Sequence, residues 1–463
     1  MNTFCITSLG CKVNQYESRQ IAQLLIEQGL KQVDAAHLAD LAIVHTCCVT
    51  HVASSKSRQV LRKYLGDGSN CKVVATGCLP QAGEQETNGL GSEVIFISKK
   101  DNLREALLNI IHTSKTAGDN CEQNTIAHSP ISKTGNGDKI KDKNELSCTK
   151  SKKISNIDPF VDILDTFHDQ TRAFLKIQDG CDGFCSYCII PKIRTQISSP
   201  EEDAILNEAR GMIATGHTEI VLTGIFLGAY GQDTVKRNRW DAHKQGLFAA
   251  LVDKLATLDG LKRLRLSSLE PGDITEELLA LFTKHENLVP HLHLPLQSGS
   301  QRILKKMNRQ YTAGQFMQSA ERVKQVLDRP ALTADIIVGF PGETQQDFQD
   351  SIDMANWAGF AKIHVFSFSK RKGTAAEKMP DQLPPQVIKE RSDILHKLDE
   401  KLQYDFRMQF AGERISVIVE NEKKQTGRCG RYFEVKLKGT NLKKRDFTYA
   451  ILDDDCFNAT PCL

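Results

Sequence analysis

The sequence has little net charge and no long hydrophobic run. Its 463 residues carry a formal net charge of +3, so only local basic clusters can argue for a nucleic-acid partner. No apolar stretch approaches the roughly 20 residues that a membrane span requires. The N-terminal segment 1–6 lacks the basic-then-apolar layout of a secretory signal. We therefore expect a cytoplasmic protein with no membrane partner.

The spaced glycines of this chain do not form a phosphate-binding loop. The stretch 339–343 lacks the Gly-Lys-Ser/Thr ending of such a loop and is typical of a turn followed by a helix start. Cysteine, by contrast, is abundant, with 14 residues. In a long chain without an export signal, this number predicts metal chemistry in a reducing compartment rather than a disulfide framework.

Three cysteines, Cys181, Cys185 and Cys188, form a tight triplet directly after the strand-like run 173–177. Closely spaced thiolates in one short loop are typical ligands of a metal or an iron–sulfur cluster. A structural zinc site takes four protein ligands, and no histidine or fourth cysteine follows within the next dozen residues. A 4Fe–4S cluster held by three thiolates leaves one iron open for a substrate or cofactor. The alternatives are a zinc knuckle or three structural thiols.

A second set of cysteines is spread over the first 80 residues. Strand-like runs end at Gly10-Cys11, Thr46-Cys47 and Gly77-Cys78, and helical patterns separate them. Alternating strands and helices predict a parallel sheet, in which the carboxyl ends of the strands meet at one edge. Parallel pairing therefore brings these three thiols into one crevice. The alternative is three buried thiols, a common environment for cysteine.

Cys48 competes with Cys47 for this second site. Adjacent strand residues point to opposite faces, so only one of the two faces the crevice easily. Cys47 is the better candidate because it stands at the same point after its strand as Cys11 and Cys78 do. In the first helix, Asn14 and Glu17 have the spacing of a capping box, which places the helix start at Asn14.

The segment 113–158 is rich in polar residues and glycine and has almost no apolar residues. Such a composition cannot bury a core and predicts a flexible linker or insertion. Cys121 and Cys148 within it are interpreted as incidental. We accordingly divide the chain into an N-terminal α/β domain (1–112), this linker (113–158), a central domain (159–398) and a C-terminal domain (399–463).

The central domain contains six strand-like runs, each followed by a helical or loop stretch. They are 173–177, 219–223, 262–266, 291–294, 333–338 and 362–366. This repeat predicts a barrel of alternating strands and helices, in which the chemistry lies on the loops at the carboxyl ends of the strands. Glu270 and Asp335 are candidates for contact with a cofactor or substrate, or else ordinary capping carboxylates.

The C-terminal domain shows three strand-like runs, 414–419, 430–437 and 446–452, which predict a small β-barrel. Cations and aromatics are interleaved here: Lys423, Lys424, Arg428, Arg431, Lys436, Lys438, Lys443, Lys444 and Arg445 with Tyr432, Phe433 and Phe447. Exposed aromatics among cations favour an RNA-binding platform. A solvated domain without RNA is the alternative, because carboxylates such as Glu420 and Glu422 lie among them.

The triplet, with Tyr187 before its last cysteine, resembles the signature of the radical S-adenosylmethionine (SAM) superfamily. Four further motifs extend the resemblance along nearly the whole chain: Leu9-Gly-Cys11-Lys-Val-Asn-Gln-Tyr-Glu17, Thr46-Cys47-Cys-Val-Thr50, Lys56-Ser-Arg-Gln59 and Lys370-Arg-Lys-Gly-Thr374. Together they are most similar to the threonylcarbamoyladenosine branch of the radical-SAM methylthiotransferases. The resemblance implies an N-terminal cluster domain, a partial (β/α)6 barrel and a small C-terminal TRAM-like β-barrel that binds RNA.

Carried over position by position, the resemblance implies two 4Fe–4S clusters. The cluster that binds and cleaves SAM would be held by Cys181, Cys185 and Cys188, with Tyr187 and Glu270 in the vicinity of SAM. The auxiliary cluster would be held by Cys11, Cys47 and Cys78. Two SAM molecules would be consumed, one to methylate a sulfur and one to supply a 5′-deoxyadenosyl radical. No catalytic side chain is assigned beyond the cluster ligands.

The implied reaction is methylthiolation of carbon 2 of N6-threonylcarbamoyladenosine at position 37 of tRNA. That ring carbon has no acidic proton, which favours radical chemistry. The base lies in the single-stranded anticodon loop, where it can be turned out and read. The implied partners are tRNA and an electron donor such as flavodoxin or ferredoxin; the sulfur source stays open.

Four features depart from the usual family pattern: Cys48, Thr195, Phe226 and the long insertion 113–158. Thr195 and Phe226 lie close to the predicted pocket and therefore bear on the choice of substrate. Two alternatives keep the chemistry and change the target to N6-isopentenyladenosine of tRNA or to an aspartate of a ribosomal protein. A non-enzymatic alternative is an RNA-binding iron–sulfur protein that senses redox state.

Overall fold

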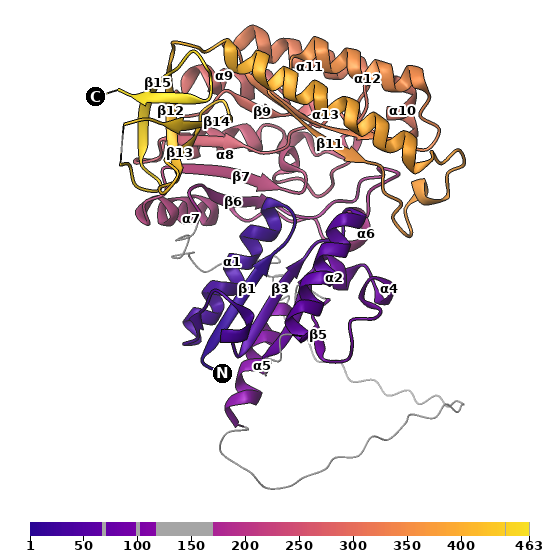
Figure 1. Cartoon of the computed structure of the whole chain (residues 1–463), viewed down its shortest axis with the longest axis vertical. Helices are drawn as coiled ribbons and strands as arrows, with labels where there is room; N and C mark the ends of the chain where they lie inside the picture. Colours follow the sequence, from indigo (N-terminus) through magenta and orange to yellow (C-terminus); the bar gives the residue numbers. More distant parts are fainter. Residues whose placement is uncertain (67–70, 99–101, 117–169, 440, 463) are drawn as a thin grey trace, which may run out of the picture.

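The computed structural model describes residues 1–66, 71–98, 102–116, 170–439 and 441–462. Most of the predicted linker 113–158, including Cys121 and Cys148, lies outside this part of the chain. Figure 1 shows three units: an N-terminal α/β domain (indigo to violet), a central barrel (magenta to orange) and a C-terminal β-barrel (yellow). Within the described residues, no helix combines the length and apolar character needed to cross a membrane.

The N-terminal domain is a parallel sheet with the strand order β2-β1-β3-β4-β5. Its strands are β1 (Thr3–Ser8), β2 (Lys31–Gln32), β3 (Leu41–Thr46), β4 (Lys72–Gly77) and β5 (Val94–Phe96). Its helices are α1 (Lys12–Glu27), α2 (His51–Gly66), α3 (Cys78–Gln81), α4 (Glu84–Thr87) and α5 (Leu103–Thr116). The predicted parallel sheet is therefore confirmed. Sequence patterns did not predict the short edge strands β2 and β5.

Helix α1 begins earlier than the sequence predicted. It starts at Lys12 with Cys11 as its N-cap, and no side chain caps it. Asn14 lies in the first turn and donates its amide to the carbonyls of Leu9 and Thr46 at 2.8 and 2.9 Å. The side chain of Glu17 points away from the helix start and forms an ion pair with Arg194 of the central domain. The predicted capping box is wrong, because both of its side chains bind partners outside the helix.

The central domain is an arc of six parallel strands. One sheet holds β6 (Ala173–Gln178), β7 (Glu219–Gly224) and β8 (Arg263–Leu266), and the other holds β9 (His291–His293), β10 (Ala331–Val338) and β11 (Lys362–Ser367). Isolated parallel bridges between Leu264 and Leu288 and between Ser268 and His293 join the two sheets. All six predicted strands are confirmed, and the arc is the expected partial barrel.

Helices cover the outside of this arc. They are α7 (Glu202–Ala214), α8 (Leu247–Ala256), α9 (Glu276–Lys284), α10 (Gln301–Lys306), α11 (Ala313–Val326), α12 (Gln345–Ala358) and α13 (Pro385–Met408). The short helix α6 (Ile190–Ile193) packs instead against the N-terminal domain. Short 3-10 turns are η1 (Ala36–Leu38) in the first domain and η3 (Leu227–Ala229), η4 (Arg237–Arg239), η5 (Ala242–Lys244), η6 (Pro271–Asp273) and η7 (Ala375–Lys378) here. Alternate residues of each strand point to opposite faces, so Leu264 and Leu266 pack in the apolar core.

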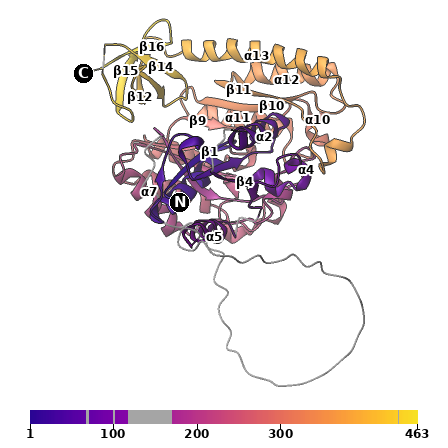
Figure 2. The ribbon, with the colours of Figure 1, turned by 60° about the horizontal axis from the view of Figure 1, so that its bottom comes forward.

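The other face of the arc is polar and is covered by the N-terminal domain. Helix α1 packs against β6 and β7, and its Glu17 lies 3.6 Å from the ammonium of the buried Lys176 on β6. Figure 2 shows the N-terminal sheet in front of the barrel, with α13 along the opposite side. The N-terminal domain thus forms the wall that an arc of six strands leaves open.

The C-terminal domain is a closed barrel with the strand order β12-β13-β14-β16-β15. Its strands are β12 (Arg414–Asn421), β13 (Thr426–Cys429), β14 (Glu434–Leu437), β15 (Phe447–Leu452) and β16 (Asn458–Pro461). The predicted run 430–437 is interrupted by a turn in which Tyr432 has a φ of 77°. Helix α13 crosses the predicted boundary at 398, and its Phe406 packs in the core of this barrel.

The C-terminal barrel docks on the central domain through buried charges. Arg263 of β8 donates to the carbonyl of Arg428 at 2.9 Å, and Arg265 donates to that of Gly430 at 3.0 Å. Both arginines pair with Glu219 of β7, at 3.2 and 2.7 Å. Burial raises the pKa of Glu219, but Arg265 and Arg263 outweigh it and lower the pKa to about 2.

Substitution of Glu219 by Gln should destabilise the protein by about 3–5 kcal/mol, because it leaves two buried guanidinium groups without a counter-charge. Urea unfolding of the variant and the wild type measures this difference. The contribution of the native carboxylate should be present above pH 4.5, its ordinary pKa, and be lost as the pH falls toward 2.

The matched control is Glu202→Gln, which removes an exposed pair with Lys254 and should change stability little. Equal effects of the two substitutions would contradict the assigned importance of the buried pair.

Candidate active site

The predicted cysteine triplet lies in the loop that follows β6. The backbone N–H of Gly183 donates to Cys181 Sγ at 3.3 Å, and Arg309 Nη1 donates to Cys185 Sγ at 3.1 Å. Burial and the charge of Cys185 together raise the pKa of Cys181 to about 11 and that of Cys188 to about 12. The three sulfurs therefore share one site, where their thiolates would repel one another. A bound iron–sulfur cluster, whose iron ions are positive, would remove this repulsion.

Glu270 and Tyr187 lie beside this loop and meet at Arg309. The guanidinium of Arg309 is bonded to Glu270 Oε1 and lies 3.3 Å from the Tyr187 hydroxyl. Glu270 Oε2 is buried without a hydrogen-bond partner among the described residues, and burial raises the pKa of this carboxyl. A bound ligand with a cationic hydrogen-bond donor would satisfy that oxygen.

Sequence reasoning missed Arg309. It lies in a basic stretch with Lys305 and Lys306, and nothing in periodicity or spacing distinguishes it from its neighbours. Its position beside Cys185 results from the fold: it follows Asn308, whose φ of 56° ends the turn after α10.

The three N-terminal strands deliver Cys11, Cys47 and Cys78 to one edge of their sheet. Burial and the thiols of Cys78 and Cys11 raise the pKa of Cys47 to about 12, so all three lie within reach of one another's charge. Cys11 is exposed, whereas Cys47 and Cys78 are buried. The expected convergence of these cysteines is therefore present in the structure.

The glycines before two of these cysteines make the close approach possible. Gly10 and Gly77 have φ values of 102° and 89°. A Cβ atom at Gly10 would lie 2.7 Å from the Cβ of Cys47, and one at Gly77 would lie 2.4 Å from the ring of His45. Each Gly-Cys pair therefore needs glycine for both its conformation and its space.

Cys48 occupies a different position from Cys47. Its Sγ donates to the carbonyl of Cys78 at 3.3 Å, and its side chain packs in an apolar cluster with Val44 and Leu61. The hydrogen bond from Cys48 lowers the pKa of Cys78, and Arg194 and His45 contribute, although burial acts in the opposite direction. Cys48 thus packs beside Cys78 and lowers the pKa of its thiol. The spacing of the cysteines in the sequence could not indicate this role.

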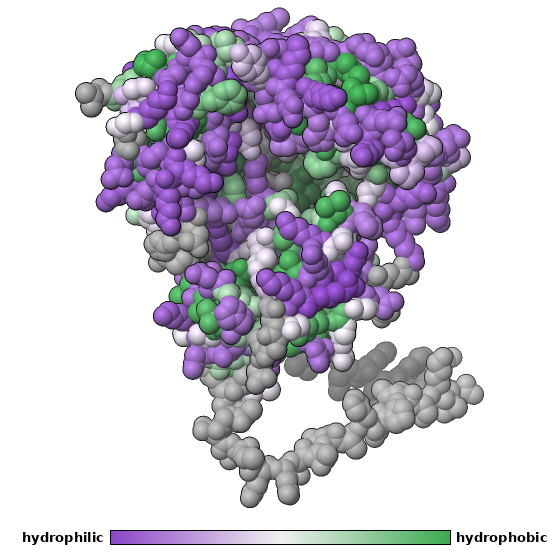
Figure 3. Space-filling view, in the orientation of Figure 1, coloured by the Kyte–Doolittle hydropathy of each residue, from purple (hydrophilic) through white to green (hydrophobic). Residues whose placement is uncertain are grey.

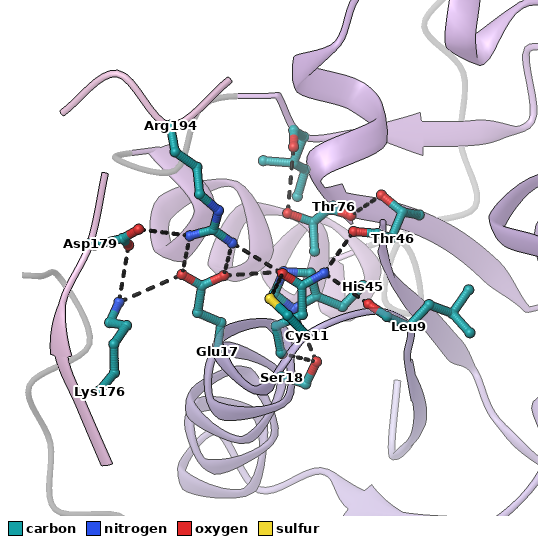
Figure 4. Close-up of polar contacts among 12 residues, drawn as sticks. Leu9, Cys11, Glu17, Ser18, His45, Thr46, Thr76, Lys176, Asp179 and Arg194 are labelled. Carbon is teal, nitrogen blue, oxygen red and sulfur yellow. Dashed lines mark hydrogen bonds and ion pairs between the residues drawn. The ribbon is translucent and has the colours of Figure 1, made fainter. Parts of the chain in front are cut away.

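Arg194 connects the two cysteine sites. Figure 4 shows its bonds to Glu17 and Asp179, beside Cys11 of the N-terminal site. Its Nη1 and Nη2 donate to both oxygens of Glu17 at 2.9 and 2.8 Å, and Nη1 also donates to Asp179 at 2.9 Å. Its Nη2 donates to Asn14 Oδ1 at 3.1 Å, the atom that Cys11 Sγ contacts at 3.6 Å. Its carbonyl accepts from the N–H of Cys181 at 2.9 Å.

Figure 3 shows a hollow between the N-terminal domain and the barrel. Polar side chains on three adjacent barrel strands, His293, Asp335 and His364, have ligand atoms within 4.8 Å of one another. Two imidazoles and a carboxylate have the composition of a metal site, but they also suit hydrogen bonding to a polar substrate. Asp335, singled out from the sequence, contacts His293 Nε2 at 3.3 Å and is no capping residue.

None of the three aromatic residues expected to form an exposed RNA platform is fully exposed: Phe433 is buried, and Tyr432 and Phe447 are half-buried. Phe433 is buried in the core of the C-terminal barrel, and Tyr432 stacks on His291 with ring centroids 4.4 Å apart. Phe447 lies under the guanidinium of Arg263. The exposed aromatics are Tyr449, under Arg414, and Phe457, near Arg407. The sequence pattern could not separate the docking face of this barrel from its free face.

Comparison with known proteins decides the family. The radical SAM superfamily matches residues 175–355, and the uncharacterized protein family UPF0004 matches residues 3–97. A threonylcarbamoyladenosine tRNA methylthiotransferase MtaB of Bacillus subtilis (strain 168) is 35% identical over 448 residues, which cover 95% of this chain and 91% of that protein. The chain belongs to the radical SAM methylthiotransferases.

Other relatives of this methylthiotransferase differ in their named substrate. An MtaB protein of Chlamydia pneumoniae is 34% identical and covers 93% of this chain and 90% of its own length. A tRNA-2-methylthio-N(6)-dimethylallyladenosine synthase of Zymomonas mobilis is 33% identical over 91% of this chain and 87% of its own length. Membership makes the protein a transferase that works with iron–sulfur clusters and SAM.

A solved structure supports the fold of the methylthiotransferase. The radical SAM methyltransferase TsrM from Kitasatospora setae, with cobalamin and a [4Fe-4S] cluster bound, superposes with a TM-score of 0.52 at 15% identity. The match covers 81% of this chain and 74% of that chain. At this identity the likeness shows a shared fold alone.

The Arg194–Glu17 pair should be strongly coupled, because it is a bidentate pair with almost no exposure to solvent. Arg194→Met should destabilise the protein by about 3–5 kcal/mol, since it leaves Glu17 and Asp179 facing each other. The double variant with Glu17→Gln should recover more than about 1.5 kcal/mol relative to additivity. Urea unfolding of the four proteins under anaerobic conditions completes the cycle.

A parallel cycle on the exposed pair of Lys244 and Asp233 serves as the control and should give a coupling near zero. Additive effects of the Arg194 and Glu17 substitutions would show that the domains are held together by other contacts.

Proposed function

We propose that this methylthiotransferase places a methylthio group on carbon 2 of N6-threonylcarbamoyladenosine at position 37 of tRNA. Sequence identity separates the substrates poorly, since relatives named for the threonylcarbamoyl and the dimethylallyl nucleoside are 35% and 33% identical. The observation that carries the proposal is a polar group of side chains at the domain junction: His293, Asp335 and His364 have ligand atoms within 4.8 Å of one another, and Lys12, which is bonded to Ser267, lies within electrostatic reach of Asp335. An apolar isopentenyl group beside them would displace water from these polar groups and offer no hydrogen bond in return.

The two cysteine sites have the donor set for two clusters. Cys181, Cys185 and Cys188 would hold the 4Fe–4S cluster that binds SAM, and Cys11, Cys47 and Cys78 would hold an auxiliary 4Fe–4S cluster. Three thiolates in each case leave one iron open. With an electron from a donor such as flavodoxin or ferredoxin, the first cluster would supply the chemistry of one-electron SAM cleavage, and the auxiliary cluster would carry the sulfur that is methylated.

The side chains around these sites bind, orient and exclude water. Glu270 Oε2 lies 4.0 Å from Arg237 Nε and accepts no hydrogen bond among the described residues. It would accept a hydrogen bond from the ammonium of SAM, and Arg309 fixes that carboxylate next to Cys185. Arg194 and Glu17 keep the two cysteine sites in a fixed relation. The N-terminal domain covers the polar face of the barrel, which keeps bulk water away from a reactive radical.

RNA binding is supported by the free face of the C-terminal barrel. Exposed Tyr449 and Phe457 lie beside Arg414 and Arg407. Exposed lysines surround them: Lys423, Lys424, Lys436, Lys438, Lys443 and Lys444. Stacking surfaces among cations bind single-stranded RNA, such as an anticodon loop, with little dependence on sequence.

Deletion of the gene should remove 2-methylthio-N6-threonylcarbamoyladenosine from total tRNA, and a restored copy should return it. Mass spectrometry of tRNA nucleosides measures both. Loss of the isopentenyl analogue instead would move the substrate to the other tRNA branch. An unchanged nucleoside pattern would contradict tRNA as the substrate and favour a ribosomal-protein aspartate or a redox-sensing role.

The two cysteine sites should fail in different ways. Cys185→Ala should abolish release of 5′-deoxyadenosine from SAM in reduced protein after cluster loading, because the SAM-binding cluster loses one of its three thiolate ligands. Cys78→Ala should preserve that release and block methylthiolation. Chromatography of 5′-deoxyadenosine and of RNA nucleosides from the same reaction separates the effects.

Cys462→Ala, at a partly buried cysteine outside both sites, is the control and should change neither product. Normal methylthiolation by the Cys78 variant would make the N-terminal thiols merely structural.

A further inference from the structure

Lys12 reaches from the N-terminal domain to the central barrel. It follows Cys11 directly and opens α1. Its ammonium donates to Ser267 Oγ at 3.1 Å, at the carboxyl end of β8. In the part of the chain that the structure describes, no carboxylate lies within ion-pair distance of this ammonium. A cation at a domain junction without a paired anion is poised to receive one from a ligand.

The other cations near Lys12 are already neutralised. Arg265 pairs with Glu219 at 2.7 Å, and Arg172 pairs with Glu420 at 3.1 Å. Among these three cations, only Lys12 has no carboxylate at ion-pair distance within the described residues. Its charge and that of Asp335, a member of the cluster of His293, Asp335 and His364, attract each other at longer range.

The proposed chemistry restricts where the substituent of the base can lie. Carbon 2 of adenine must lie between the SAM site and the auxiliary site, because it reacts with both. The N6 substituent flanks the same edge of the ring, on the other side of N1. A substituent that extends from this edge toward the N-terminal domain would meet Lys12, the residue next to Cys11.

We propose that Lys12 binds the carboxylate of the threonylcarbamoyl group and so selects this nucleoside over its isopentenyl analogue. This inference rests on the proposed function. A charge-assisted bond between the ammonium and the carboxylate orients the substituent, and thereby the ring carbon that reacts. Lys12 is a specificity-determining residue, next in sequence to a cysteine that serves the chemistry.

The cluster of His293, Asp335 and His364 completes the pocket for the rest of the substituent. Asp335 accepts hydrogen bonds from the hydroxyl or the carbamoyl N–H groups, and His293 is held by Thr333 Oγ1 at 2.9 Å. A divalent cation fits this cluster less well, because the neighbouring ammonium of Lys12 would repel it and Asp335 is already paired with His293.

Two other carboxylates or phosphates could reach Lys12 and need to be separated from the substrate carboxylate. The carboxylate of SAM is expected at the other site, where Glu270 and Arg309 surround Cys185. A phosphate of the RNA backbone would be present in every RNA substrate. The three candidate anions, which are the substrate carboxylate, the SAM carboxylate and an RNA phosphate, therefore predict different effects of a Lys12 substitution on RNAs that differ in the base at position 37.

The test uses cluster-loaded enzyme and three anticodon stem-loop RNAs. Their position 37 carries threonylcarbamoyladenosine, the same nucleoside with its carboxylate converted to a carboxamide, or isopentenyladenosine. Lys12→Met should lower kcat/KM for the first RNA roughly 10- to 100-fold. The wild type should turn over the carboxamide RNA with a similar loss, and Lys12→Met should lower that residual rate no further. Lys12→Arg should keep the preference for the carboxylate.

Release of 5′-deoxyadenosine without RNA reports whether the Lys12→Met variant is folded and loaded, and it should match the wild type. Lys254→Met, which removes an exposed lysine on α8, is the matched control and should not affect any substrate. Equal losses on all three RNAs would assign Lys12 to a phosphate, and lost SAM cleavage would assign it to SAM; either result overturns the inference.

The inference and the proposed function fail separately. Wild-type turnover of the threonylcarbamoyl RNA together with a Lys12→Met variant of equal rate overturns the inference alone. A wild-type enzyme that methylthiolates only the isopentenyl RNA overturns the proposed substrate, and the inference with it.

Discussion

The buried ion pair between Glu17 and Arg194 is the constraint on which the rest of the site depends. Two charged groups with almost no exposure to solvent are costly unless each finds several partners. Here the guanidinium also binds Asp179 and Asn14, and His45 and Lys176 approach the carboxylate of Glu17. The N-terminal domain can satisfy its buried carboxylate only in one position on the barrel. That position also sets the separation of the two cysteine sites.

The contacts between the three domains combine buried polar pairs with apolar packing. The inner face of the arc carries Lys176, Glu219, Arg263 and Arg265, and the flanking domains meet this face with the carboxylate of Glu17 and with backbone carbonyls. Beside these polar contacts, Ile189 and Ile193 of the central domain pack in an apolar cluster with Val44 and Leu61 of the N-terminal domain. Polar side chains on the inner face of the barrel can bind a polar substrate. A packed apolar core at this place would fill the space that the base needs.

The sequence predicted those features that local patterns determine. The strands of the parallel sheet and of the barrel follow from short apolar runs between helical patterns, and the strand-end positions of Cys11, Cys47 and Cys78 follow from topology. The capping box at Asn14 was wrong because Asn14 binds the strand ends and Glu17 binds Arg194. The exposure expected of Tyr432 and Phe433 was wrong because Tyr432 stacks on His291 of the central domain and Phe433 lies in the core of its own barrel. Arg309 and the supporting role of Cys48 were missed for the same reason: only the tertiary structure brings them to the thiols.

The proposed roles in substrate recognition and in cluster binding fall on consecutive residues of the N-terminal domain, Lys12 and Cys11. Cys11 caps α1 and Lys12 opens it, so any motion that moves the thiol also moves the ammonium. The backbone around them is fixed by Gly10, which no larger residue can replace beside Cys47, and by Asn14, which binds the ends of β1 and β3. A barrel that generates a radical is common to many reactions. In this enzyme the wall that closes the barrel, rather than the barrel itself, carries both the second cysteine site and the cation that chooses the base.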